Sequence, residues 1–117
     1  MALNLANTVT ITAKTAYANV TTVSSNVLTN SASSNTIYKI NNINLTNYKT
    51  TAQTTTVVVN RSGTNYYIAN AISIPGNSLL VLLGKDNSIY LEENDTLQIF
   101  SSVNSSIHLV SSYELLS

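Results

Sequence analysis

The chemistry open to this chain is limited first by its single histidine and its lack of cysteine. General acid–base and nucleophilic catalysis need a base within hydrogen-bond reach of the group it activates, most often a histidine. His108 alternates with the apolar Ile107 and Leu109, so we expect it on a surface or interface face of a strand. One imidazole without any thiolate also makes no imidazole–thiolate metal site. We therefore expect neither enzyme activity nor a catalytic residue.

Acidic side chains gather once, at Glu92, Glu93 and Asp95. Together with the Asn94 amide they could hold a hard cation such as calcium, which takes about six to eight oxygen ligands. The spacing differs from an EF-hand loop, which has alternate acidic positions, a glycine and a distant glutamate. Asp and Asn are also ordinary turn formers. Two interpretations follow: a plain turn between two strands, which we favour, and a cation site at these three carboxylates.

Seven tyrosines and three isolated glycines are the remaining candidates for binding chemistry. Aromatic faces stack on sugars, but the chain has no tryptophan and most of its tyrosines lie in strand-like runs. Tyr66 and Tyr67 must point to opposite faces of a regular strand, which leaves at most one of them exposed. We expect the tyrosines to pack in the core or in interfaces. Gly63, Gly76 and Gly84 form no phosphate-binding loop, and we expect no cofactor.

The charge of the chain argues against several classes of partner. Five Lys or Arg residues balance five Asp or Glu residues, and 9% of residues are charged, where roughly 25% is usual. The cations are scattered singly, whereas binding to nucleic acid needs them clustered. No polybasic run accompanies an amphipathic stretch, which argues against a membrane surface. Asn, Ser and Thr supply the polar surface, a composition suited to packing against other proteins because few charges must be desolvated.

The first residues, MALNLANTVTI, lack the basic and continuous apolar regions of a signal peptide, so we expect synthesis in the cytoplasm without export. The longest strongly apolar run, residues 79–83, is much shorter than the ~20 residues of a membrane span.

Apolar residues that recur at every second place predict the strands that carry these side chains. This period of two runs through residues 66–74 and 107–115, as in strands with one buried face. At Asn41 and Asn42 the period changes parity, as a β-bulge would cause. Turn-forming residues separate the runs, and the C-terminal two thirds shows no helical period. We predict about eight or nine strands in a single antiparallel β-sandwich. A jelly roll is the leading topology because it hides most sheet edges.

Residues 1–35 differ in composition from residues 36–117, which we expect to form the sandwich core of one domain. Thr, Ser, Asn and Ala dominate the first segment, so it buries less apolar surface per residue. It is either an extended N-terminal arm that adds to a neighbour's sheet edge or an ordinary outer strand pair of the same domain.

Short motifs spread over nearly the whole chain provide a further signal. They are ANVTT at 18–22, IYKIN at 37–41, LTN at 45–47, YYIA at 66–69, IP at 74–75, LLV at 79–81, IYLEEND at 89–95 and VSSYE at 110–114. In order and spacing they resemble the small virion structural proteins of tailed bacteriophages, especially those of cyanobacteria. That family commonly has Gly at the place of Asn94, and Asn also tolerates turn conformations.

The resemblance implies a β-sandwich component of the virion and carries no catalytic residue. Small size, low charge and the N-terminal segment then favour a decoration or cement protein of the capsid. We expect it to bind the major capsid protein or another virion protein as a homo-oligomer, with a trimer as the first guess. One alternative is a neck, tail or fibre-attachment protein. Another is a module that binds a host glycan or receptor.

Overall fold

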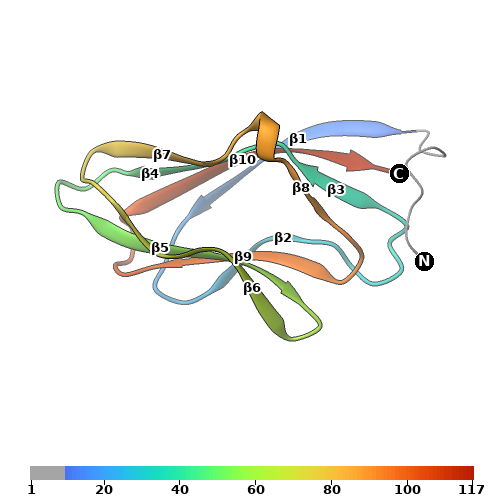
Figure 1. Cartoon of the computed structure of the whole chain (residues 1–117), viewed down its shortest axis with the longest axis horizontal. Coiled ribbons are helices and arrows are strands. Elements are labelled where there is room, and N and C mark those ends of the chain that lie inside the picture. The colour runs from blue at the N-terminus through green and yellow to red at the C-terminus, as the bar shows by residue number, and fades with distance from the viewer. Residues whose placement is uncertain (1–9) are drawn as a thin grey trace.

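The apolar alternation folds into strands over nearly the whole length of the computed structural model, which describes residues 10–117 (Figure 1). The ten strands of this part are β1 (Ile11–Asn19), β2 (Ser25–Thr29), β3 (Ile37–Ile40), β4 (Ile43–Asn47), β5 (Gln53–Arg61), β6 (Thr64–Ile74), β7 (Ser78–Leu83), β8 (Ile89–Leu91), β9 (Asp95–Ser101) and β10 (Ile107–Leu116). A short 3-10 helix, η2 (Lys85–Asn87), separates β7 from β8. Among the described residues, no helix is long and apolar enough to cross a membrane.

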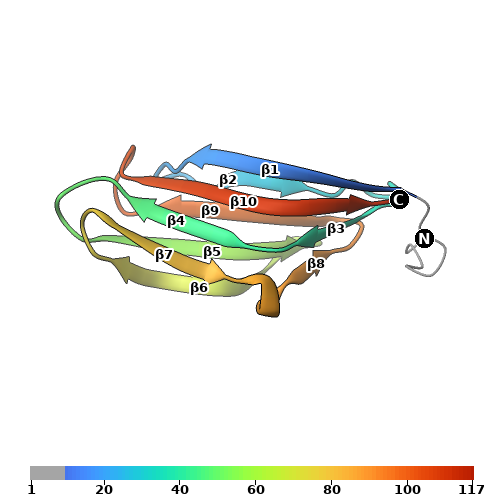
Figure 2. The ribbon, with the colours of Figure 1, turned by 90° about the horizontal axis from the view of Figure 1, so that it is seen from above.

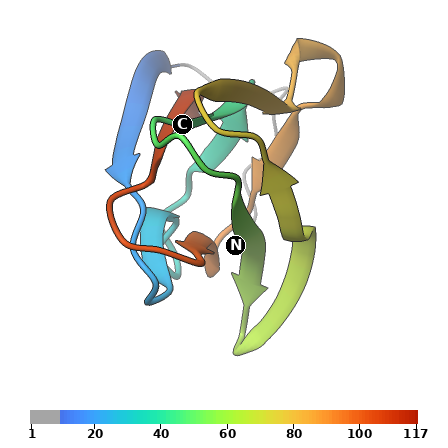
Figure 3. The same ribbon diagram turned by 90° about the vertical axis from the view of Figure 1, so that its left-hand side faces the viewer.

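Two antiparallel sheets pack face to face, as the end view shows (Figure 3). In sheet A the order is β7-β4-β10-β3-β8, and β1 pairs with the other side of β10. β4 and β3 pair with successive halves of β10 and so share one place in sheet A. β7 pairs with β4 and β8 pairs with β3, so these two strands share the next place. Sheet A therefore has four places, in the order β1, β10, β4 with β3, and β7 with β8 (Figure 2). Sheet B has the order β2-β9-β5-β6.

The chain passes between the sheets in the manner of a jelly roll. It runs from β1 in sheet A to β2 in sheet B, back to β3 and β4, then through β5 and β6 in sheet B, and so on to β10 in sheet A. This gives two four-position sheets with the crossing connections of two Greek keys. The predicted all-β antiparallel sandwich with jelly-roll-like topology is confirmed.

The core lies between the inward faces of both sheets. Its fully buried large side chains include Ile43 and Leu109 from sheet A and Leu97 and Ile99 from sheet B. Burying a side chain of this size stabilises a fold by about 1.5–3 kcal/mol relative to leaving it exposed. The cross-sheet contacts among these residues therefore set the spacing of the two layers.

The predicted change of face at Asn41 and Asn42 is confirmed. Ile40 and Ile43 are both fully buried although they stand at opposite parity, and the chain leaves strand geometry between them. The Asn41 N–H donates to the Ser112 carbonyl at 2.9 Å, and the Ser112 N–H donates to Asn42 Oδ1 at 2.9 Å. These bonds join β3 and β4 to β10 across the break.

Two turns require glycine for different reasons. The β5–β6 hairpin closes at Ser62 and Gly63, which have φ of 53° and 86°, the left-handed pair of a two-residue hairpin loop. At Gly76 the backbone approaches the loop before β5, so a Cβ there would collide with the Thr50 carbonyl. The Asn77 N–H donates to the Lys49 carbonyl at 2.8 Å and fixes this approach.

The N-terminal segment contributes one of the two edge strands of each sheet. In the described part of the segment, β1 pairs with β10 and β2 pairs with β9. Val20, between the two strands, is fully buried and belongs to the core cluster. Within one copy of the chain, β1 and β2 thus occupy the places of ordinary outer strands. Residues 1–9 of the proposed arm lie outside the described residues.

Candidate functional site

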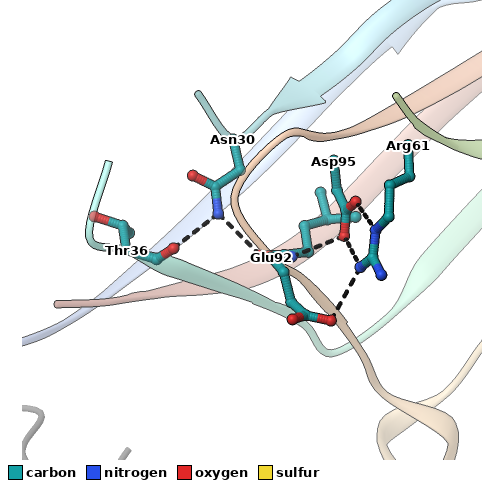
Figure 4. A network of polar contacts seen from close by, with 6 residues as sticks. Asn30, Thr36, Arg61, Glu92 and Asp95 are labelled. Atoms are coloured by element: carbon teal, nitrogen blue, oxygen red, sulfur yellow. Dashed lines mark hydrogen bonds and ion pairs between the residues drawn. The ribbon is translucent and has the colours of Figure 1, made fainter. Parts of the chain in front are cut away.

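A polar network joins the β5–β6 hairpin to the turn between β8 and β9 (Figure 4). Arg61 is the last residue of β5, and Asp95 is its cross-strand partner at the start of β9. Arg61 Nε donates to Asp95 Oδ1 at 2.5 Å and Nη2 donates to Asp95 Oδ2 at 2.6 Å, a bidentate pair. The same Nη2 donates to Glu92 Oε2 at 3.0 Å. The Asp95 side chain is buried, whereas Arg61 and Glu92 are about half exposed.

These contacts neutralise the buried carboxylate. The Glu92 N–H also donates to Asp95 Oδ2 at 2.9 Å, so both Asp95 oxygens accept bonds within the protein. The hydrogen bond to Asp95, followed by the one to Glu92, raises the pKa of Arg61 above its ordinary value. With one cation and two carboxylates, the network carries a net charge of −1.

Glu93 contacts the loop between β2 and β3. Its Oε2 accepts the Asn35 N–H at 2.8 Å, and this bond lowers the pKa of the Glu93 carboxyl. Asn94 has φ of 75° at the tip of the turn, a conformation that asparagine tolerates. Of the three carboxylates predicted as a cation site, Glu92 and Asp95 meet at Arg61 and Glu93 binds a different loop. In the part of the chain that the structure describes, no three His, Cys, Asp or Glu side chains are grouped so that they could hold a metal ion.

Asn30 was missed by the sequence analysis, although it anchors the same region (Figure 4). Its side chain is almost fully buried, and Nδ2 donates to the carbonyls of Thr36 at 2.8 Å and Leu91 at 3.0 Å. Its backbone N–H donates to the Asp95 carbonyl at 2.9 Å. Asn30 thereby links the end of β2 in sheet B to β8 in sheet A. Asparagine is common in turns, so the sequence carries no sign of this burial.

A groove lies beside this network, between the β5–β6 hairpin and β8. Its volume is about 360 Å³. Its walls are formed by Val59, Arg61, Tyr66, Tyr67, Ile68, Ile89, Tyr90 and Asp95. Tyr66, Tyr67 and Tyr90 are 61%, 60% and 46% exposed.

The prediction that at most one of Tyr66 and Tyr67 is exposed is wrong. The two rings do belong to opposite faces, since Tyr67 pairs with Val58 and Tyr66 with Val59. Tyr66 nevertheless stays exposed because the hairpin projects from the body of the sandwich (Figure 1), and it lines the groove beside β8. Among the tyrosines, Tyr38 and Tyr113 stack on each other at 5.7 Å and are partly buried.

His108 lies on the outer face of sheet A, since it alternates along β10 with the buried Ile107 and Leu109. It is exposed, and its ring packs against that of Tyr48 at a tilt of 37°, with 4.3 Å between centroids. It belongs to a cross-strand row of residues that is formed by Asn19, His108, Thr46 and Leu79. The neighbouring row consists of Tyr17, Val110, Asn44 and Val81. These eight residues, hereafter the uncharged face, contain no Asp, Glu, Lys or Arg.

The uncharged face exposes large apolar side chains at both of its ends. Tyr17 on β1 is 76% exposed, and Leu79 and Val81 on β7 are 58% and 56% exposed. A hollow of about 320 Å³ lies beside Tyr17, His108 and Val110. A sheet face that combines exposed apolar groups with uncharged polar ones can be covered by another protein without desolvating a formal charge.

No family model matches this chain, and a search of curated proteins finds no match either.

Proposed function

We propose that this protein is a structural component of a tailed-bacteriophage virion, a decoration protein that binds the outside of the capsid as a homo-oligomer. The uncharged face is the observation that carries the proposal. It covers four strands of a rigid sheet and can be buried without desolvating a formal charge, which is the main cost of burying a polar surface. The assembly is proposed to be a phage virion because the sequence motifs resemble those of virion structural proteins.

Repetition makes such a surface sufficient for stable attachment. A capsid presents many identical sites, and an oligomer that contacts several of them at once converts weak individual contacts into high overall affinity. Apolar contacts that are made without ion pairs also depend little on salt, because screening acts on charges. The attachment proposed here is therefore insensitive to ionic strength.

The test combines particle imaging with one pair of variants. Val81→Glu places a charge in the uncharged face, whereas Val23→Glu places it at a residue that is 73% exposed in the β1–β2 loop. Both proteins should fold, and we expect the first variant alone to lose binding to particles that lack the wild-type protein. A reconstruction that finds the chain only in the neck or tail would overturn the decoration role and favour the neck, tail or fibre-attachment alternative. Copy numbers from stained gels separate the two, with hundreds expected for a head protein.

The groove supports a second candidate function, binding of a host-surface glycan. Tyr66 and Tyr90 offer exposed rings that can stack on a sugar, and Arg61 with Glu92 offers hydrogen-bonding groups. The net negative charge of the network disfavours acidic sugars, so the ligand class is a neutral oligosaccharide. A glycan array with wild type, Tyr90→Ala and Tyr17→Ala tests it. Binding that Tyr90→Ala loses and Tyr17→Ala keeps supports the groove, and no binding to any neutral glycan rejects it.

A further inference from the structure

Among residues 10–117, no strand pairs with the outer side of β1, which forms one edge of sheet A (Figures 2 and 3). All nine residues of β1 pair with β10 without a register shift. Thr10 and Ser117 exchange two backbone bonds at 2.9 Å, and the Val20 N–H donates to the Ile107 carbonyl. Because bonding alternates along an antiparallel pair, even-numbered residues of β1 bond to β10. The odd-numbered residues therefore direct their N–H and C=O groups away from the sheet.

The other sheet edges carry features that hinder pairing with another chain. β2 has five residues and a register shift at Asn26. β6 pairs with two register shifts, and Ala71 within it has φ of 49°. The β7–β8 edge is interrupted at residues 84–88. Bulges, short strands and interruptions are the usual protection of sheet edges. β1 has no bulge and no proline, and Lys14 is its one charged residue.

We propose that β1 pairs antiparallel with β1 of a second copy of this chain, about a two-fold axis at Thr15. This register pairs the nine residues of one strand with the nine residues of the other, so every outward backbone group finds a partner. The pairing is a property of the chain in solution and does not depend on the virion role.

The side chains favour this register and a partner identical to the chain itself. Across the axis, Tyr17 lies opposite Ala13 of the second copy, so a large ring meets a small side chain. Lys14 lies opposite Ala16 of the second copy. A shift of the axis to Lys14 would place the two lysines opposite each other, which is unfavourable. Self-complementarity of this kind is what an isologous two-fold interface requires.

The oligomeric state of charge variants at Thr15 tests the pairing. Thr15 is exposed, and its side chain faces its own counterpart across the proposed axis. We expect a wild-type dimer by analytical ultracentrifugation. Thr15→Lys and Thr15→Glu should each weaken it by about tenfold or more, because like charges then face each other. An equimolar mixture of the two variants should dimerise again. Ser73→Lys, on the exposed part of β6, is the control and should remain dimeric.

Three results would overturn the pairing: a monomeric wild type, a dimer that both Thr15 variants keep, or a mixture that stays monomeric. Hydrogen exchange on the wild type provides a readout that needs no variant. The N–H groups of Ala13, Thr15 and Tyr17 should become protected as the protein concentration rises. Failure of this test leaves the particle-binding test of the proposed function unaffected, because that test uses the sheet face rather than the edge.

Discussion

Buried amides hold the two layers together at the scale of single residues. Asn47, at the end of β4 in sheet A, is fully buried, and its Nδ2 donates to the carbonyls of Thr51 and Ile74 at 2.9 Å each. Its Oδ1 accepts the Lys49 N–H at 3.0 Å. Ile74 ends β6 in sheet B, so Asn47 joins the sheets as Asn30 does elsewhere. All the hydrogen-bonding groups of such an amide must be matched, since an unmatched buried polar group is costly.

Asn47→Asp tests this role with almost no change of shape. The carboxylate replaces a donor by an acceptor that faces two carbonyl oxygens in a buried place. We expect a loss of about 3 kcal/mol in the free energy of unfolding, measured with denaturant. Asn44→Asp, on the outer face of the same strand, should change it by about 0.5 kcal/mol or less. Equal effects of the two substitutions would contradict the role assigned to Asn47.

Replacing either of two adjacent buried threonines by valine should change the stability in opposite directions. Thr55 Oγ1 is buried and has no hydrogen-bond partner among the described residues. Thr56 Oγ1, by contrast, accepts the Ala71 N–H at 3.0 Å. Thr55→Val should therefore stabilise the protein by about 1 kcal/mol, whereas Thr56→Val should destabilise it by a similar amount. Thermal and denaturant unfolding of both variants measure the difference, and a destabilised Thr55→Val would show that its hydroxyl is satisfied.

At the scale of elements, the Arg61 network holds the β5–β6 hairpin against the β8–β9 turn. The hairpin projects from the body of the sandwich (Figure 1), and Arg61 ties its base to Asp95 and Glu92. The network also forms one end of the tyrosine groove, so the stability of the hairpin and the shape of the groove depend on the same ion pair.

Arg61→Ala leaves the Asp95 carboxylate buried without its cation. We expect a loss of about 2–3 kcal/mol, less than for a fully buried pair because half of the Arg61 side chain is exposed to solvent. Arg61→Lys keeps the charge but loses the bidentate geometry, and it should lie between Arg61→Ala and wild type. Denaturant unfolding gives the free energies. An Arg61→Ala variant as stable as wild type would show that the network contributes nothing.

At the scale of the whole molecule, the uncharged face proposed to bind the capsid and the β1 edge proposed to form the dimer both belong to sheet A. A two-fold axis perpendicular to sheet A keeps the outer faces of both copies on the same side. The β1 dimer would therefore join two uncharged faces into one continuous surface, which suits attachment to a lattice of repeated sites. The opposite sheet and the groove would remain open to solvent.

Global unfolding should also depend on alkaline pH through Tyr113. Burial, with a further contribution from Tyr38, raises the pKa of the Tyr113 phenol above its ordinary value of about 10. The neutral phenol is therefore favoured in the fold, so its contribution is complete below pH 10 and is lost as pH rises through the folded pKa. Stability should fall less steeply above pH 10 in Tyr113→Phe than in wild type.

The sequence alone determined the layers of this protein. Residues that alternate between apolar and polar bury one face of each strand, and the turn formers Ser62–Gly63 and Pro75–Gly76 end strands where the backbone needs them. Even the switch at Asn41 and Asn42 was predictable, because a bulge is the local way to change the buried parity.

Tertiary structure decided which edges and faces remain open. The exposure of Tyr66 depends on the projection of the β5–β6 hairpin from the body of the sandwich, and the role of Asp95 depends on Arg61, which is 34 residues away in the chain. The open edge of β1 follows from the order of strands in sheet A rather than from the residues of β1. Local periodicity determines how each strand is buried, but the neighbours of a strand are set by contacts between distant segments.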